Sequence, residues 1–334
     1  MLVGGLGEEA LLRKLRDIFA SSEPNVRVGI GDDAAILGCP AGKEAVWSTD
    51  LTLEGIHFER QWQTPQQLGR KCLAVNLSDI AAMGATPSFA LLSIACPTDT
   101  EVDFILELAR GFAGLAADES VAVVGGDTTA SAGGIALSVT VGGYIDDGAA
   151  LLRSGAMVGD SILVTGKLGS AAAGMQLIQE GEGEAYPDLT AAFLEPSARI
   201  GAGLAAVKVG ATSMTDISDG LASDLRHICE ESGVGAMIEP ASLPFSPHLD
   251  EAVIRFGWNR ESIMLSGGED YELLFTLTGS IAEQVKEVIA HESGQQVTII
   301  GEIMEHEYGV RLVDRDGSGR DIPRHGYEHF QSSY

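Results

Sequence analysis

The stretch VAVVGGDTT, residues 121–129, is the clearest strand signal in the first half of the chain. Its apolar run predicts a buried β-strand, which we expect to end at the glycine pair and Asp127. The following segment, GGIALSVTVGGYI (133–145), predicts the next strand, paired with the first. Upstream, PSFALLSIACP (87–97) predicts another buried strand bounded by prolines. The first half is therefore expected to contain a β-sheet.

Helical patterns separate these strands. Apolar residues recur at helical spacing in residues 65–85 and 100–120, and residues 44–58 read as one or two strands. The second half repeats the order strand, turn, helix in DSILVTGKLGSAAAGMQLIQE (160–180) and TSMTDISDGLASDLRHICEESG (212–233). The pattern predicts an α/β or α+β fold in both halves. Loop chemistry over residues 146–160 predicts a boundary, with domains at 1–147 and 148–334.

The charge of the chain limits its partners. Its 334 residues carry 48 Asp and Glu against 21 Lys and Arg, a net charge of −27. Such a chain repels nucleic acid and anionic membranes, so we expect neither as a partner. A free nucleotide would be repelled as well, unless metal ions lie between the protein and the phosphates.

The cysteines and the apolar runs indicate the cellular compartment to expect for this protein. The four cysteines form no C-x-x-C pair, which argues against a zinc knuckle or a disulfide framework. The N-terminal segment predicts an amphipathic helix rather than a signal peptide. No apolar run approaches the roughly 18 residues that span a bilayer. We expect a reduced, cytoplasmic protein.

Aspartates recur where a strand or helix meets a loop, at Asp32, Asp33, Asp50, Asp79, Asp127, Asp216 and Asp219. Each one alone is explained by turn formation or helix capping. Together they favour a ligand-binding site over simple turn formation, because GGD and SGGED place glycines before the acid, where a backbone can approach a ligand closely. Hard cations prefer oxygen ligands, and Ser48 and Thr49 can add hydroxyl or carbonyl oxygens. The pattern predicts several Mg²⁺ ions that hold a polyphosphate.

Other phosphate-binding motifs are missing. TGKLGS (165–170) lacks the spacing of a P-loop, and no G-x-G-x-x-G opens a helix after a strand. His57 follows the acidic strand and could face the site or be an ordinary core or surface residue. Arg153 stands at the expected domain boundary, where it could form an interdomain ion pair or contact a nucleotide phosphate.

The ordered motifs resemble thiamine-monophosphate kinases of the AIR-synthase-like (PurM-like) ATP-binding superfamily. The resemblance runs from Gly29 nearly to the end of the chain. It is carried by the motifs GIGDDAA, STDLTLEGIHF, KCLAVNLSDIAAMGA, VGGDTT, LRSGA, DISDGLASDL, SGGEDYELLFT and GYEHF. It implies a two-domain PurM-like fold, with an N-terminal domain that dimerises through its sheet and a C-terminal α/β domain. It also implies a homodimer that phosphorylates thiamine monophosphate with ATP as the donor.

The resemblance further implies roles for individual residues. The Mg²⁺ ligands would be Asp33, Ser48, Thr49, Asp50, Asp79, Asp127, Asp216 and Asp219. The ATP contacts would be Gly126, Asp127, Arg153 and Ser218. His57, Glu269 and Tyr327 would contact the thiamine phosphate. The preceding DIPRH (321–325) lacks a tryptophan that some members carry there.

The aspartate pattern and the family resemblance both favour direct transfer of a phosphoryl group from ATP to the acceptor. A phosphate monoester is largely ionised near neutral pH, so the transfer needs no strong general base, and none is assigned. The alternatives are a related superfamily enzyme and a metal-loaded binding module without turnover. No cysteine precedes Cys39 and the chain ends in QSSY, whereas selenophosphate synthetases and carbamoyl dehydratases of hydrogenase maturation carry reactive cysteines at these ends.

Overall fold

The computed structural model describes residues 1–19, 25–31, 33–322 and 326. The chain divides into two compact units. Unit 1 comprises Met1–Ile80 and Ala85–Gly148, and unit 2 comprises Ala81–Gly84 and Ala149–Tyr334. No helix in the described ranges is both long enough and apolar enough to cross a bilayer.

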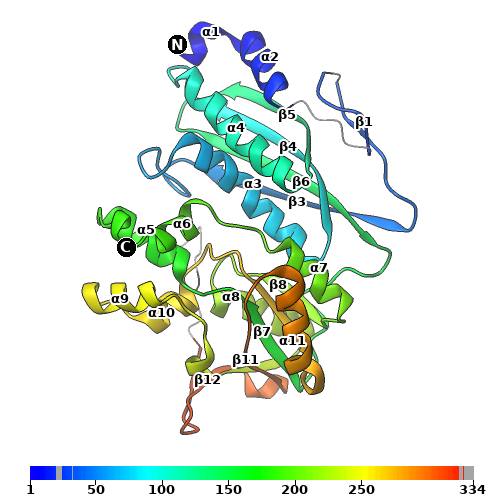
Figure 1. Cartoon of the computed structure of the whole chain (residues 1–334), viewed down its shortest axis with the longest axis vertical. Coiled ribbons are helices and arrows are strands. Elements are labelled where there is room, and N and C mark those ends of the chain that lie inside the picture. Colours follow the sequence, from blue (N-terminus) through cyan, green and yellow to red (C-terminus); the bar gives the residue numbers. More distant parts are fainter. Residues whose placement is uncertain (20–24, 32, 323–325, 327–334) are drawn as a thin grey trace. The chain divides into compact units, whose positions relative to one another are not determined.

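Unit 1 is built on a mixed sheet with the strand order β3-β6-β4-β5, covered on one face by helices α3 and α4 (Figure 1). The pairs β3–β6 and β6–β4 are antiparallel, and β4–β5 is parallel. In chain order the elements are α1 (Val3–Leu6), α2 (Glu8–Ile18), β1 (Val26–Val28), β2 (Ile36–Leu37), β3 (Lys43–Leu53), α3 (Pro65–Ala82), β4 (Thr86–Cys96), α4 (Val102–Asp118), β5 (Ala122–Ala130) and β6 (Ala136–Asp146).

Two expectations about this sheet were wrong. Strand β5 does not end at the glycines but continues through Asp127 to Ala130, because its backbone pairs with β4 as far as Cys96. Strand β6 does not pair with β5; it lies between β3 and β4. The α+β fold class itself is confirmed, with strands and helices alternating along the chain.

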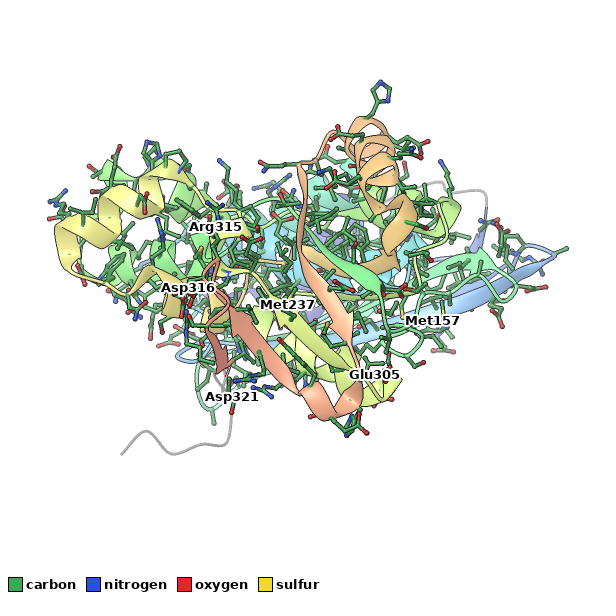
Figure 2. All side chains as sticks on the ribbon, turned by 90° about the horizontal axis from the view of Figure 1, so that it is seen from below. Met157, Met237, Glu305, Arg315, Asp316 and Asp321 are labelled. Atoms are coloured by element: carbon green, nitrogen blue, oxygen red, sulfur yellow. The ribbon has the colours of Figure 1, made fainter. Side chains whose placement is uncertain are left out.

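Unit 2 contains a sheet with the strand order β13-β12-β9-β11-β7-β10-β8. Its strands are β7 (Asp160–Thr165), β8 (Ser213–Asp216), β9 (Gly235–Ile238), β10 (Leu273–Thr278), β11 (Val297–Met304), β12 (Val310–Val313) and β13 (Gly319–Asp321). The hairpin of β12 and β13, which carries Arg315 and Asp316, ends this sheet beside β9 (Figure 2).

The helices of unit 2 cover both faces of the sheet. They are α5 (Ser170–Gln179), α6 (Pro187–Leu194), α7 (Ile200–Lys208), α8 (Leu221–Ser232), α9 (Pro247–Phe256), α10 (Arg260–Ser266) and α11 (Gly279–Ser293), with short 3₁₀ turns at Gly183–Ala185, Pro240–Ser242 and His306–Tyr308. Strand β7 shows why there are two cores. Ile162 and Val164 join one cluster, and Leu163, between them, joins the other, as alternation along a strand requires.

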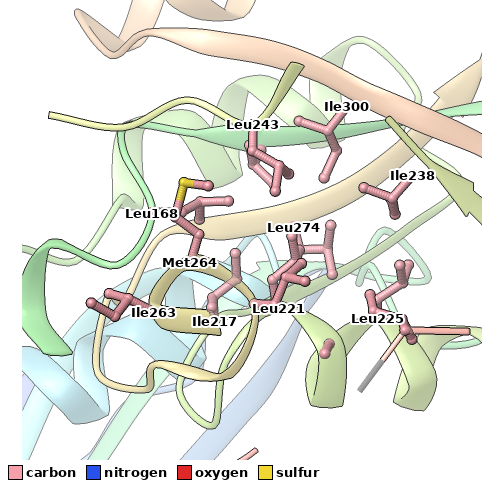
Figure 3. Packing of buried hydrophobic residues seen from close by; sticks show 14 of the residues in the cluster. Leu168, Ile217, Leu221, Leu225, Ile238, Leu243, Ile263, Met264, Leu274 and Ile300 are labelled. Carbon is pink, nitrogen blue, oxygen red and sulfur yellow. The ribbon is translucent and has the colours of Figure 1, made fainter. Parts of the chain in front are cut away.

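The first core of unit 2 lies between the sheet and helices α5, α8 and α10. Leu221 and Leu225 of α8 pack there with Leu274 of β10 and Ile300 of β11 (Figure 3). The second core joins the other sheet face to α7 and α11 through Ala205, Phe275 and Ile289. Because β8 and β10 are held between these cores, the turns at their ends have firm support.

Helices α3 and α4 cross so closely that glycine is required on both. A Cβ atom at Gly111 would lie 2.0 Å from the carbonyl oxygen of Gln66, and one at Gly69 would lie 2.0 Å from that of Leu108. These are backbone atoms, so a larger residue would force the helices apart. The crossing sets the position of α3 against the sheet, and α3 carries Asp79.

We expect Gly111→Ala to lower the free energy of unfolding by about 1–3 kcal/mol, because the added methyl separates the two helices. The matched control is Gly114→Ala on the same helix. Its Cβ would meet only the Arg70 guanidinium, at 3.7 Å, so the better helix propensity of alanine should stabilise by about 1 kcal/mol. Urea denaturation of both variants measures the difference, and equal effects would contradict the tight crossing.

Candidate functional site

Strand β3 and helix α3 bring a hydroxyl and two carboxylates together in unit 1. Ser48 donates a hydrogen bond to the Asp79 carboxylate. Surrounding protein atoms and, to a smaller extent, the Asp79 charge raise the pKa of Asp50 to about 6. Asp50 nevertheless keeps much of its surface exposed. Two neighbouring carboxylates that repel each other and can be reached from solvent could hold a cation.

Alternation along β3 separates Thr49 from this pair. Ser48 and Asp50 face α3, whereas Trp47 and Thr49 face the other side of the sheet, where the Trp47 ring packs at a tilt against Phe89 with 4.6 Å between ring centroids. The Thr49 hydroxyl donates to the carbonyl of Val139 at 2.9 Å. The hydroxyl is thus engaged by β6, and its side chain is not brought to the carboxylate pair.

A pocket of about 560 Å³ opens in unit 1 and gathers three other predicted residues. Asp33, Gly126 and Asp127 line it, together with Trp47 and Thr140. This volume lies within the usual range for small-molecule sites. The structure therefore separates Asp33, Gly126 and Asp127 at this pocket from Ser48, Asp50 and Asp79 at α3.

Gly126 has a structural reason to be glycine. A Cβ there would lie 1.8 Å from the carbonyl oxygen of Leu92 on the neighbouring strand. Gly268 is similar, because its Cβ would lie 2.5 Å from the carbonyl oxygen of Ser218. The glycines before these acids thus permit close contact between backbones of this chain, and a ligand is not needed to explain them.

His57 lies in the turn after β3. Its Nδ1 accepts a hydrogen bond from the backbone N–H of Leu53 at 3.0 Å. In the neutral ring the proton is therefore assigned to Nε2, which makes that nitrogen a hydrogen-bond donor. A donor of this kind can contact a phosphate oxygen, but it cannot take up a proton at Nε2.

In unit 2, three predicted residues lie at the end of β8. Asp216 is the last residue of the strand and is 4% exposed, and Ser218 and Asp219 follow in the turn before α8. Arg153 reaches the same place, since its Nε donates to the hydroxyl of Thr215 at 3.3 Å. Arg153, which lies 62 positions before Thr215 in the sequence, is thus brought beside the strand whose last residue is Asp216.

The SGGED loop lies against this turn. The backbone N–H of Glu269 donates to the carbonyl of Ser218 at 2.8 Å. Gly326 also approaches, because a Cβ there would lie 2.3 Å from the Asp219 carbonyl oxygen. Tyr327, like Asp32, lies outside the described residues, so its predicted role stays a prediction.

The sequence analysis did not single out Asp224. Its carboxylate accepts the backbone N–H groups of Ser218 and Asp219, at 3.1 and 3.2 Å. Burial, then the charges of Asp216 and Asp219, raise the pKa of Asp224 to about 8. Asp224 could have been found from the sequence, because it lies in the first turn of a predicted helix. Backbone amides at that point need hydrogen-bond acceptors.

Asp270, Glu272 and Arg199 were also missed. Arg199 donates to Glu272 through Nε and Nη2, at 2.7 and 2.6 Å. All three residues line a second pocket of about 400 Å³ in unit 2 that none of the predicted site residues lines. Their pairing joins positions more than 70 residues apart in sequence, and spacing alone does not reveal such contacts.

The aspartate carboxylates and the Ser48 hydroxyl suit a hard divalent cation, because their ligand atoms are oxygens. Within residues 1–19, 25–31, 33–322 and 326, no three His, Cys, Asp or Glu side chains are grouped closely enough to form a metal site by themselves. Mg²⁺ commonly binds through one or two carboxylates with waters and substrate phosphates, so the Asp50–Asp79 pair fits that mode of binding.

Comparison with known families agrees with this architecture. A family model for the N-terminal domain of AIR synthase related proteins matches residues 31–145, and the model for their C-terminal domain matches residues 157–313. The fold and its two acidic groups therefore define a protein of the AIR synthase related class.

Individual relatives identify the family within this class. The thiamine-monophosphate kinase of Escherichia coli K12 is 37% identical over 97% of this chain and 98% of its own length. The crystal structure of that kinase from Stenotrophomonas maltophilia is 35% identical, with a TM-score of 0.82 over 94% of this chain and 96% of the other. The structure of AaThiL complexed with AMPPCP and TMP is 33% identical, with a TM-score of 0.78 over 99% of both chains. The chain belongs to the thiamine-monophosphate kinase family.

The raised pKa of Asp224 predicts how stability depends on pH in the presence of chelator. The unfolded chain loses this proton near the ordinary value of 3.8, whereas the folded chain keeps it up to about pH 8. Folding therefore takes up a proton between these values, and Asp224 lowers stability as pH rises through this window, by at most about 1.4 kcal/mol per pH unit.

We expect Asp224→Asn to weaken this loss, because asparagine resembles the protonated carboxyl and does not ionise. The urea midpoint between pH 5 and pH 8 should fall less in this variant than in the parent chain. Asp147→Asn, at an exposed loop position, controls for the change in net charge. Parallel pH profiles for the parent and Asp224→Asn would contradict the assignment.

Proposed function

We propose that this chain transfers the γ-phosphoryl group of ATP to thiamine monophosphate, giving thiamine diphosphate and ADP. The observation that carries the proposal is its similarity over nearly the whole length to thiamine-monophosphate kinases, 37% over 97% of the chain for the E. coli enzyme. A relative of nearly equal length binds AMPPCP, the methylene analogue of ATP, together with TMP. Both ligands correspond to the two substrates proposed here.

The transfer needs little acid–base chemistry. A phosphate oxygen of thiamine monophosphate forms a bond to the γ-phosphorus, while the bond from that phosphorus to the β–γ bridging oxygen breaks and ADP leaves. The attacking monoester has a second pKa near 6, so it is largely ionised at neutral pH. The Nε2–H of His57 is therefore assigned to hold the thiamine phosphate by donating a hydrogen bond, not to remove a proton.

Carboxylates within β3, β5 and α3, at the end of β8 and in the loops would hold Mg²⁺. The proposed ligands are Asp33, Ser48, Thr49, Asp50, Asp79, Asp127, Asp216 and Asp219, with Thr49 limited to its backbone because its hydroxyl is bonded to Val139. When bound, Mg²⁺ supplies positive charge that neutralises phosphate oxygens. The raised pKa of Asp50 supports this assignment, since nearby positive charge would favour its ionised form.

Other residues would orient the two substrates. Gly126, Asp127, Arg153 and Ser218 are proposed for ATP, and His57, Glu269 and Tyr327 for the thiamine phosphate. The hydrogen bond from Arg153 to Thr215 supports the proposed role of Arg153 in ATP binding. A guanidinium that is already fixed loses less conformational entropy when it binds a phosphate. Positioning of this kind supplies most of the catalysis in phosphoryl transfer.

The direct test is a product assay. Purified chain is incubated with ATP, Mg²⁺ and thiamine monophosphate, and ADP and thiamine diphosphate are quantified by chromatography. We expect equal amounts of both products and none in the presence of chelator. ATP consumption without thiamine diphosphate, or release of AMP, would contradict the proposal and point to another acceptor.

We expect Asp79→Asn to lower turnover by at least a hundredfold, because one of the two paired carboxylates loses its charge. Asparagine keeps an oxygen that can accept from Ser48, so the thermal midpoint should change little. Asp147→Asn is the charge-matched control and should retain the parent rate. A fully active Asp79→Asn variant would rule out the metal role of this residue.

We also propose that the chain forms a homodimer through the sheet of unit 1. Strand β3 stands at one end of the sheet order, and Trp47 and Leu51 on it are 55% and 52% exposed. Large apolar side chains on an edge strand favour pairing with another surface.

Leu51→Lys should therefore shift the chain from dimer to monomer, because a lysine would be buried without a partner. Light scattering coupled to size exclusion measures the mass directly. Ile254→Lys is the control, since Ile254 is 81% exposed but lies on α9 of unit 2. A dimer that survives Leu51→Lys would exclude this face.

A further inference from the structure

The loop from Gly267 to Glu272, between α10 and β10, has an unusual backbone. Glu269 and Tyr271 adopt positive φ angles of +67° and +49°, and among the described residues only Ser120 otherwise does so without being glycine. The left-handed region is unfavourable for residues with a Cβ atom, and such conformations persist only where the surroundings impose them. Something in unit 2 must therefore hold this loop.

Part of the restraint comes from the turn after β8. The N–H of Glu269 donates to the Ser218 carbonyl at 2.8 Å, and that of Tyr271 donates to the Ile217 carbonyl at 2.9 Å. The Ile217 N–H returns a bond to the Glu272 carbonyl at 2.8 Å. These bonds extend the pairing of β10 with β8 and keep Glu269 beside Ser218.

Two carboxylates of the loop restrain it further. Asp270 accepts the N–H of Gly169 at 2.6 Å and that of Ala171 at 3.2 Å, both at the start of α5. Glu272 accepts two bonds from Arg199, at 2.7 and 2.6 Å, and one from the hydroxyl of Thr165 at 2.6 Å. The anchors are spread over β7, α5 and the start of α7, which the two cores hold rigidly.

Anchored and strained positions alternate along the loop. Asp270 and Glu272 are fastened through their side chains, and Glu269 and Tyr271 carry the left-handed backbone. Tyr271 lies between the two fastened residues, and Glu269 lies beside Asp270 with its own N–H bonded to Ser218, so neither has much freedom to relax. The direction of the Glu269 side chain is thus set by its neighbours rather than by its own preference.

We propose that Asp270 and Glu272 are positioning residues that hold the strained loop so that Glu269 meets the thiamine phosphate substrate. This inference rests on the proposed function, because Glu269 is assigned to that substrate. Neither positioning residue touches a substrate in this scheme; each acts through Glu269.

The test is a double-mutant cycle in steady-state kinetics with Asp270→Asn, Glu269→Gln and the double variant. Asparagine can accept only one of the two amide bonds, so the loop loses an anchor. We expect Asp270→Asn to raise KM for thiamine monophosphate tenfold to a hundredfold and to leave KM for ATP within about twofold. In the Glu269→Gln background the same change should add less than threefold, because the residue it positions is already altered.

Control variants separate positioning from general damage. Asp188→Asn removes a carboxylate of the same pocket wall that bonds Ser246 and His248, and it should leave both KM values near those of the parent. Thr165→Val removes the hydroxyl bonded to Glu272 and should raise KM for thiamine monophosphate by a smaller factor, with Thr165→Ser restoring it. If Asp270→Asn fails to fold, the Thr165 pair still decides the outcome.

The outcomes are distinct. Parent chain that makes no thiamine diphosphate means that the proposed function is wrong. Active parent with an unchanged KM in Asp270→Asn and Thr165→Val, or with fully multiplicative effects in the cycle, overturns the positioning role alone. Equal rises in both KM values indicate a general structural defect and likewise overturn it.

Discussion

The proposed chemistry of both units depends on neighbouring aspartate carboxylates in crowded protein surroundings. In unit 1 Asp50 lies near Asp79, and its pKa is raised to about 6. In unit 2 burial and the charges of Asp216 and Asp219 raise the pKa of Asp224 to about 8. Ionising such groups costs free energy that the fold alone does not recover, so cations and positively charged contacts are favoured there. In the proposed scheme, cations held by these carboxylates would also allow a chain of net charge −27 to bind polyphosphates.

Unit 2 supports its acidic turn with an unusually complete set of backbone contacts. The turn after β8 receives Asp224 from α8, the Glu269 amide from the loop before β10 and the close approach of Gly326. Helices on both faces hold β8 and β10 between two apolar cores. A strained loop such as Gly267–Glu272 can persist only on such a base, because its unfavourable backbone must be offset by many fixed neighbours.

Much of the fold was accessible from local patterns. Local sequence patterns predicted α3, α4, β4, α5 and α8, and the motif order placed the chain in the family that the comparisons confirm. The errors were at β5, where glycines were taken as the end of a strand. In the structure the strand continues through them by pairing with β4, and Gly126 is glycine because the β4 backbone lies too close for a side chain. Strand order was wrong for a related reason, since an apolar pattern says that a strand is buried but not which strand it pairs with.

The sequence by itself determined the alternation of strands and helices, the acidic character and the family, because these depend on residue type and order along the chain. Only the tertiary structure decided which carboxylates share a neighbourhood. Ser48, Asp50 and Asp79 meet against α3, while Asp33 and Asp127 line a pocket with Trp47. Arg199 and Glu272 meet across 73 positions of the chain. Such contacts follow from sheet order, strand face and helix crossing, and all three are set by long-range packing and backbone hydrogen bonds.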